Sequence, residues 1–144
     1  MSWDWRGELI EKALLAREHA YAPYSHIYVG AALLCANNEM LGGFNIENAA
    51  LTPGICAERV AFARALYAGE REFKAIAVVG GPKDMDAATT GYFYPCGVCR
   101  QWMAEFCGPD FIVLAAISAG DFQEISLAEL LPHSFGPGHM KLPQ

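Results

Sequence analysis

Three neighbouring stretches decide the fold class: CAERVAFARALYA (residues 56–68), KAIAVV (74–79) and CGVCRQWMAEFC (96–107). The first stretch is rich in good helix formers, has no internal Gly or Pro, and is followed by Gly69, so it predicts a helix. The second is a short, mostly apolar run before a Gly-Gly-Pro turn signal, and it predicts a buried strand. The third follows Pro95 and carries its apolar residues on one helical face, which predicts another helix. Helix, strand and helix in succession are typical of an α/β fold.

The flanking segments extend this alternation. Apolar residues at helical spacing predict a first helix, which ends before a proline because proline disfavours helical geometry in the preceding residue. Two apolar runs around an Asn-Asn turn signal predict a hairpin, and a capping-box pattern predicts a short helix near the end. The predicted ranges are a helix over 4–21, strands over 28–35, 40–45 and 111–117, and a short helix from Ser126 to Leu131. The patterns by themselves therefore predict four strands with helical crossovers.

Composition and charge exclude several classes of protein. The 144 residues carry a formal net charge of -6, and the ten Lys and Arg form no run, so we expect no polymeric nucleic acid as partner. No apolar run approaches the roughly 18 residues that span a bilayer, so we expect no membrane partner. A chain of this size needs no disulfides to hold a core. The first residues lack the features of a secretory signal, and we expect a reducing, cytoplasmic location.

Five cysteines in a reducing compartment indicate metal binding or catalysis rather than crosslinks. Cys96 and Cys99 are three residues apart, so a first helical turn would place their sulfurs on the same side. Cys56 begins the other predicted helix, and helix N-termini favour thiolates. Three thiolates suit zinc and leave a fourth position open, as in catalytic zinc sites. Cys35, in an apolar strand, and Cys107, at a helix end, are expected to be buried free thiols.

Charged residues beside these cysteines fit such a metal site. Glu58 follows Cys56 by two residues, and its carboxylate reaches the metal only if the metal lies off the end of the helix. There it could take a proton from a water whose pKa zinc lowers to about 7 and deliver that proton to a leaving group. Three thiolates around a divalent ion leave a net negative charge. Either Arg59 or Arg100 could donate a hydrogen bond to a thiolate and offset that charge.

Two other interpretations stay open at the level of these motifs. Cys96 and Cys99 taken alone would also fit a dithiol redox protein. A metal-stabilised binding module without catalysis would need a fourth ligand, and the four histidines lie outside any ligand-spaced pair. Cys56 together with Glu58 weighs against both.

Further motifs appear in order along the chain: Ala22-Pro23-Tyr24-Ser25, Val29-Gly30-Ala31-Ala32, Asn45-Ile46-Glu47-Asn48-Ala49, Ile55-Cys56-Ala57-Glu58-Arg59, Pro95-Cys96-Gly97-Val98-Cys99-Arg100-Gln101 and Glu129-Leu130-Leu131-Pro132. Together they resemble the small, homotetrameric cytidine deaminases that act on free nucleosides, and the zinc deaminases share the Cys-x-Glu and Pro-Cys-x-x-Cys signature. The resemblance implies a three-layer α/β/α sandwich around a five-stranded mixed sheet. It also implies a homotetramer. We expect a single domain over residues 1–144, whose tail (131–144) is either loose or packed on a neighbouring subunit.

The resemblance also implies a reaction, the zinc-dependent hydrolytic deamination of cytidine or deoxycytidine at ring carbon 4, in pyrimidine nucleoside salvage. Cys56, Cys96 and Cys99 would hold one zinc per subunit, and Glu58 would carry protons to N3 and then to the departing ammonia. The remaining site residues it implies are Asn45 and Glu47 on the sugar 3′-hydroxyl, the Ala57 backbone N–H on the base, Phe135 over a neighbouring subunit's pocket, and Arg59 on a thiolate.

Two residues depart from the family pattern within the expected pocket. The family usually has a phenylalanine on the pyrimidine face where this chain has Ile27, and a tyrosine near the 5′ side of the sugar where it has Leu51. An aliphatic residue keeps apolar contact with the base but loses ring-ring geometry, worth about 1 kcal/mol. The loop over residues 80–94, with Asp84, Asp86 and three consecutive aromatics, is a candidate for replacement contacts. A modified cytosine nucleoside or a cytosine-bearing antibiotic is therefore an alternative substrate.

Overall fold

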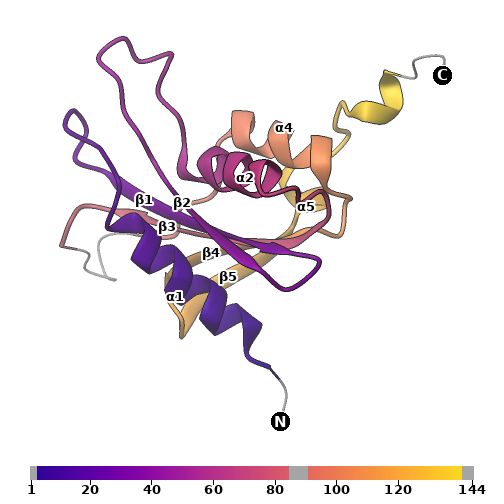
Figure 1. Ribbon diagram of the computed structural model, residues 1–144, viewed down its shortest axis with the longest axis horizontal. Helices are drawn as coiled ribbons and strands as arrows, with labels where there is room; N and C mark the ends of the chain where they lie inside the picture. Colours follow the sequence, from indigo (N-terminus) through magenta and orange to yellow (C-terminus); the bar gives the residue numbers. More distant parts are fainter. Residues whose placement is uncertain (1–2, 85–90, 141–144) are drawn as a thin grey trace.

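Local sequence signals place the helices and strands largely as the patterns predict. The computed structural model describes residues 3–84 and 91–140 (Figure 1). In chain order the elements are α1 (Trp5–Arg17), β1 (Tyr28–Cys35), β2 (Met40–Phe44), α2 (Ala57–Tyr67), β3 (Phe73–Gly81), α4 (Gly97–Phe106), β4 (Ile112–Ser118), β5 (Asp121–Ser126), α5 (Leu127–Leu130) and a 3₁₀ turn (Pro137–His139). None of the helices within the described residues has the length and apolar character needed to cross a membrane.

The first helix is shorter than its apolar spacing predicts. The structure ends α1 at Arg17, and the amides of the next three residues bond three residues back, as in a tight turn. Tyr21 then leaves the helical path and forms a bridge with Ile46. The prediction of helix up to Tyr21 was therefore wrong by four residues, because pairing with a distant segment takes over.

The strands form one mixed sheet in the order β2-β1-β3-β4-β5. β1 is antiparallel to both β2 and β3, β3 is parallel to β4, and β4 is antiparallel to β5. This confirms the five-stranded mixed sheet that the family resemblance implies, one strand more than the residue patterns predicted. The strand that the patterns missed is β5, an edge strand that is only partly covered and reads DFQEIS.

Helices cover both faces of the sheet, and Figure 1 shows α1 on one side with α2 and α4 on the other. On the first face, Leu9, Ile10 and Ala13 of α1 are fully buried against β1, β3 and β4. On the second, Phe62 of α2 is fully buried within an aromatic cluster that includes Phe106. The three-layer α/β/α sandwich is therefore confirmed.

The absence of a side chain at one position of β2 lets a helix approach the sheet closely. A Cβ on Gly43 would lie 2.3 Å from the carbonyl oxygen of Ala57 and 2.5 Å from the amide nitrogen of Ala61. The first turn of α2 thus rests directly on the backbone of β2. This contact fixes the height of the helix end that carries Cys56 and Glu58.

Candidate active site

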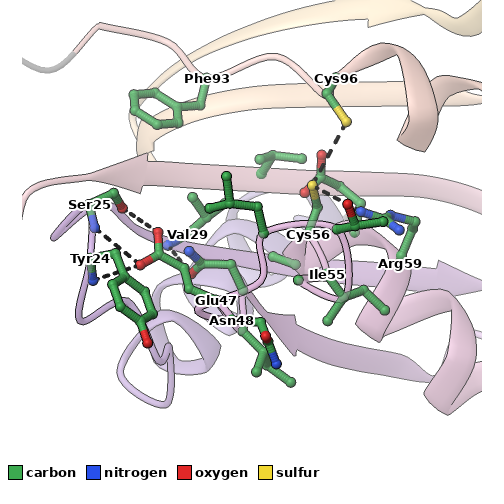
Figure 2. Close-up of a pocket in the computed structure, with 18 of the residues that line it drawn as sticks. Tyr24, Ser25, Val29, Glu47, Asn48, Ile55, Cys56, Arg59, Phe93 and Cys96 are labelled. Atoms are coloured by element: carbon green, nitrogen blue, oxygen red, sulfur yellow. Dashed lines mark hydrogen bonds between the residues drawn. The ribbon is translucent and has the colours of Figure 1, made fainter.

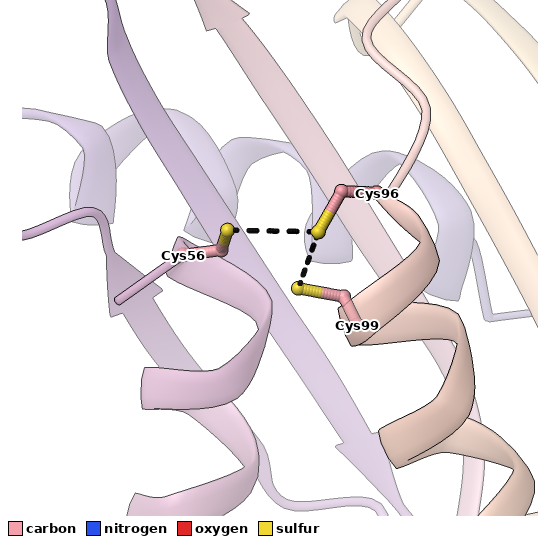
Figure 3. Close-up of side chains that lie close together, drawn as sticks. All are labelled: Cys56, Cys96 and Cys99. Atoms are coloured by element: carbon pink, nitrogen blue, oxygen red, sulfur yellow. Dashed lines mark hydrogen bonds between the residues drawn. The ribbon is translucent and has the colours of Figure 1, made fainter. Parts of the chain in front are cut away.

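Three cysteine thiols meet where two helices begin (Figure 3). Cys56 is the N-cap residue of α2 and Cys96 is the N-cap residue of α4, while Cys99 lies in the first turn of α4. The sulfur of Cys96 lies 3.8 Å from that of Cys56 and 3.6 Å from that of Cys99. All three sulfurs lie within 4.8 Å of one another. The predicted cluster therefore forms.

The spacing of these sulfurs fits zinc. Bonds of about 2.3 Å from zinc in a tetrahedral arrangement separate the ligand sulfurs by about 3.8 Å. A disulfide would require about 2.05 Å, so the thiols are not paired covalently. Within the described residues the cluster holds these three ligands and no fourth. An open position of this kind is typical of catalytic zinc rather than of closed structural zinc.

The surroundings favour thiolates. Both helix N-termini direct unpaired N–H groups toward the cluster. The pKa of Cys56 is lowered to about 5, because Cys99 and, to a smaller extent, Arg59 donate hydrogen bonds to its sulfur. The distance from Nη2 of Arg59 to this sulfur is 3.5 Å. Of the two candidate arginines, Arg100 turns elsewhere and donates to backbone carbonyls of the segments before α4 and at the end of α5.

Glu58 is the buried carboxylate of the site. It follows Cys56 and Ala57 in the first turn of α2, and it is 4% exposed. Burial raises its pKa to about 7, and the nearby negative charge of Cys56 acts in the same direction. The carboxylate lines the same cavity as two of the thiols.

That cavity has a volume of about 700 Å³, within the range of small-molecule sites. Cys56, Cys96, Glu58 and Arg59 line one end of it, and Figure 2 shows Tyr24, Ser25 and Glu47 grouped at the other. The walls between the two ends are mainly apolar: Val29, Ile55, Val78 and Phe93.

The polar end is held together by two side chains that link separate segments. The carboxylate of Glu47 accepts hydrogen bonds from the backbone amides of Tyr24 (3.0 Å) and Ser25 (3.1 Å) and from the Ser25 hydroxyl. The Ser25 hydroxyl lowers the pKa of Glu47, which keeps it anionic. Asn45 accepts from the amide of Val29 (2.8 Å) and donates to the carbonyl of Ile27 (2.9 Å).

Other predicted site residues lie in different places. Ala57 lines the cavity, and so does Leu51, which is 79% exposed and has a positive φ of 65°. Ile27 and Phe135 are not among the described residues that line it. Phe135 is 58% exposed and stacks on His139, with ring centroids 5.1 Å apart. Its expected role on a neighbouring subunit stays a prediction.

The loop over residues 80–94 was predicted to supply replacement contacts to the pocket. The structure selects Phe93 and Tyr94 as lining residues, whereas Tyr92 is directed elsewhere and donates to Asp121. Asp86 lies outside the described residues.

The two remaining thiols take no part in the site. Cys35 is fully buried and Cys107 half-buried, and both are free. Burial raises their pKa values to about 11 and about 12. Both therefore stay protonated at neutral pH, as expected of bystanders.

Comparison with known proteins agrees with this geometry. Residues 3–115 match the family model described as the cytidine and deoxycytidylate deaminase zinc-binding region. An open three-thiolate site next to a buried carboxylate places the protein in the class of zinc-dependent deaminases. Because the family model covers most of the chain, the protein belongs to the cytidine and deoxycytidylate deaminase family. It binds one zinc ion per subunit.

Individual relatives are similar over nearly their whole length. A cytidine deaminase of Sporosarcina psychrophila is 46% identical over 89% of each chain. One of Halalkalibacterium halodurans is 47% identical over 90% of this chain and 93% of its own. The crystal structure of a cytidine deaminase from Burkholderia pseudomallei superposes with a TM-score of 0.79 at 45% identity, covering 89% of this chain and 97% of the other. These relatives do not favour the dithiol redox, binding-module or antibiotic alternatives.

Proposed function

We propose that the protein deaminates cytidine or deoxycytidine hydrolytically, giving the uracil nucleoside and ammonia. The observation that carries this proposal is the buried Glu58, which lines the same cavity as Cys56 and Cys96 of the three-thiol cluster. The names of the most similar relatives support the choice of substrate.

Proton transfer is the task of Glu58. Cys56, Cys96 and Cys99 would hold zinc, which would supply Lewis acidity and lower the pKa of a water molecule in the site. The water oxygen adds to ring carbon 4, and Glu58 passes one proton of that water to N3. The bond between carbon 4 and the amine then breaks, and Glu58 passes the second proton to the departing ammonia. The oxygen stays on the ring as the new carbonyl, so both protons of the water are accounted for.

Neighbouring groups hold the reactants for this transfer. The N–H of Ala57 lies in the first turn of α2, where backbone N–H groups have no partner within the helix, so it can donate to the base. Arg59 offsets the negative charge that three thiolates leave on the metal site. Its Nε is buried without a hydrogen-bond partner among the described residues, which fits a role that is mainly electrostatic.

At the other end of the cavity, Glu47 and Asn45 would bind the sugar 3′-hydroxyl. Glu47 is anionic and has already fixed the segment around Tyr24 and Ser25 through three hydrogen bonds. Its Oε1 already accepts from both amides, whereas Oε2 accepts only from the Ser25 hydroxyl and can accept a further bond from a sugar hydroxyl. A substrate held at both ends spans the apolar walls with its base.

The finer biological assignments are part of the same proposal. We infer a homotetramer in which Phe135 contacts the pocket of a neighbouring subunit, because it is exposed and lies outside its own cavity. We also infer a role in pyrimidine nucleoside salvage in the cytoplasm, where a reducing environment keeps the thiols able to bind zinc. Light scattering at micromolar and nanomolar concentrations tests the assembly, and an active monomer would refute the shared pocket.

The decisive experiment is Glu58→Gln, which keeps the shape of the side chain. We expect unchanged zinc content and a loss of roughly 10²–10⁴-fold in kcat, measured by the absorbance change from cytidine to uridine. Glu105→Gln, at an exposed position of α4, is the matched control and should keep wild-type activity. An active Glu58→Gln protein would overturn the mechanism. A zinc-loaded wild type that leaves cytidine and deoxycytidine unchanged would overturn the function.

A further inference from the structure

We propose that Phe93 is a specificity-determining residue that forms an aromatic wall of the base-binding part of the cavity. Gly80 makes this possible, because its lack of a side chain leaves the space in which the ring lies. This inference rests on the proposed function and adds to it which side chain contacts the pyrimidine ring. Figure 2 shows Phe93 across the cavity from the group formed by Tyr24, Ser25 and Glu47. It comes from the segment that leads to Cys96.

The glycine makes the position of the ring possible. A Cβ on Gly80 would lie 2.3 Å from Cδ2, 2.8 Å from Cε2 and 2.8 Å from Cγ of Phe93. The ring therefore lies directly on the backbone of β3, in space that any other residue at position 80 would fill. A side chain there would push the ring away from the sheet and into the cavity or toward solvent.

Hydrogen bonds hold the chain on both sides of the place where the Phe93 ring lies against β3. Arg17, at the end of α1, donates to the carbonyl of Gly81 (2.9 Å) and to that of Pro82, which fixes the end of β3. On the other side, the hydroxyl of Tyr92 donates to the carboxylate of Asp121 at 2.5 Å, next to the turn before β5. The bonds of Arg17 and Tyr92 thus hold the chain near Gly80 and next to Phe93.

The ring of Phe93 lines the cavity on the wall across from the polar end, and its aromatic character points to the base as its contact. The reacting end is fixed by the thiols and Glu58, and the polar end by Asn45 and Glu47. The apolar lining of the cavity includes the aliphatic Val29, Ile55 and Val78 and the ring of Phe93. A flat apolar ring favours a flat heteroaromatic partner through offset or edge-to-face contacts.

This arrangement also accounts for the aliphatic residue at position 27. Ile27 is not among the described lining residues, and its backbone carbonyl is instead bonded to Asn45. Phe93 supplies an aromatic surface to the same cavity from a different segment of the chain. The aromatic contact with the base is thereby relocated to another wall of the pocket.

The test is a double-mutant cycle with steady-state kinetics on cytidine and calorimetry with uridine. Phe93→Ala is expected to raise the KM for cytidine and the Kd for uridine about tenfold, more than it lowers kcat. It should also raise kcat/KM for 5-bromocytidine relative to cytidine, because space opens beside the base. Gly80→Ala should give a similar rise in KM by displacing the ring, but should add little in the Phe93→Ala background. Gly108→Ala, whose Cβ meets open space, is the control.

The possible results distinguish failure of the Phe93 inference from failure of the proposed function. Unchanged KM and Kd in Phe93→Ala would overturn the inference, and so would independent, additive effects of Gly80→Ala and Phe93→Ala. If the wild type binds uridine but does not convert cytidine, the proposed function fails, while the uridine Kd of the variants still tests the wall. If the wild type binds no uridine, both are wrong.

Discussion

Substituting Gly43 by alanine tests how the sheet positions the reactive end of α2. The new Cβ would lie 2.3 Å from the carbonyl oxygen of Ala57, whereas ordinary contacts begin near 3.4 Å. The helix start would therefore have to retreat by about 1 Å, and it carries both Cys56 and Glu58. A displacement of about 1 Å in a catalytic group can cost about 10²-fold in rate. Overpacking of this kind also costs about 1–3 kcal/mol of stability.

The assay compares kcat/KM on cytidine, zinc content and thermal unfolding for Gly43→Ala and Gly42→Ala. The neighbouring residue points to the opposite face, where its Cβ would lie 3.1 Å from the Cβ of Ala16 on α1. We expect Gly42→Ala to lose some stability and to stay within about threefold of wild-type activity. Gly43→Ala should lose about 10²-fold in kcat/KM well below its melting temperature, where the protein is folded.

The comparison of the two variants decides the outcome. Wild-type kcat/KM and full zinc content in Gly43→Ala would refute the reasoning, since the helix start would then tolerate the added methyl group without moving its catalytic residues. Equal losses in both variants would refute it too, because the effect would not depend on which face is crowded.

Three further predictions concern charge and packing. Replacing Arg59 by methionine should weaken zinc binding about 10–100-fold, measured by competition with a chromophoric chelator; unchanged affinity would show that its contact with Cys56 does not stabilise the metal site. Phe62→Ala should destabilise the fold by about 3–5 kcal/mol in denaturant titrations, because the ring is fully buried among other aromatics; a loss below about 1 kcal/mol would contradict that packing. A hydrogen bond from Arg6 lowers the pKa of Glu124, so this pair stabilises the fold above the unfolded pKa of about 4.3 and ceases to do so as the pH falls through the folded value. Because both side chains are over a third exposed, Glu124→Gln should cost at most about 0.5 kcal/mol at pH 7 and progressively less as the pH falls through the folded pKa of Glu124, and a pH-independent effect would contradict this.

Hydrophobic periodicity and the positions of Gly, Pro and capping residues predicted most of the helices and strands, because these signals are local. The strand over 28–35 matches β1, and the helix over 56–68 extends beyond α2 by one residue at each end, at its two caps. The Ser126 hydroxyl accepts from the amide of Glu129 at 3.2 Å, as the capping pattern predicts. In β5, by contrast, polar and apolar residues mix at a partly exposed edge, so the strand depends on pairing with β4 that no local pattern shows.

The chemical site was predictable for a similar reason, and its supporting contacts were not. Cys96 and Cys99 share a first turn by spacing alone. The choice between Arg59 and Arg100 depended on two backbone carbonyls to which Arg100 donates, one at nearby Pro95 and one at distant Leu130. The role of Gly80 is equally invisible in the sequence, because it is defined by a ring thirteen positions away across an undescribed segment.

The N-cap cysteines connect the metal site to the substrate site. N-cap positions usually hold Ser, Thr, Asp or Asn, whose side chains satisfy a free N–H in the first turn. Neither Cys56 nor Cys96 makes such a bond, so the starts of α2 and α4 lack a stabilisation of about 1 kcal/mol each. The N–H groups left free in these first turns favour anionic sulfurs, and Ala57, the first residue of α2, lines the cavity. We therefore expect zinc binding by the two cap residues to stabilise both helix starts and the position of Ala57, which would couple metal occupancy to the geometry that substrate binding requires.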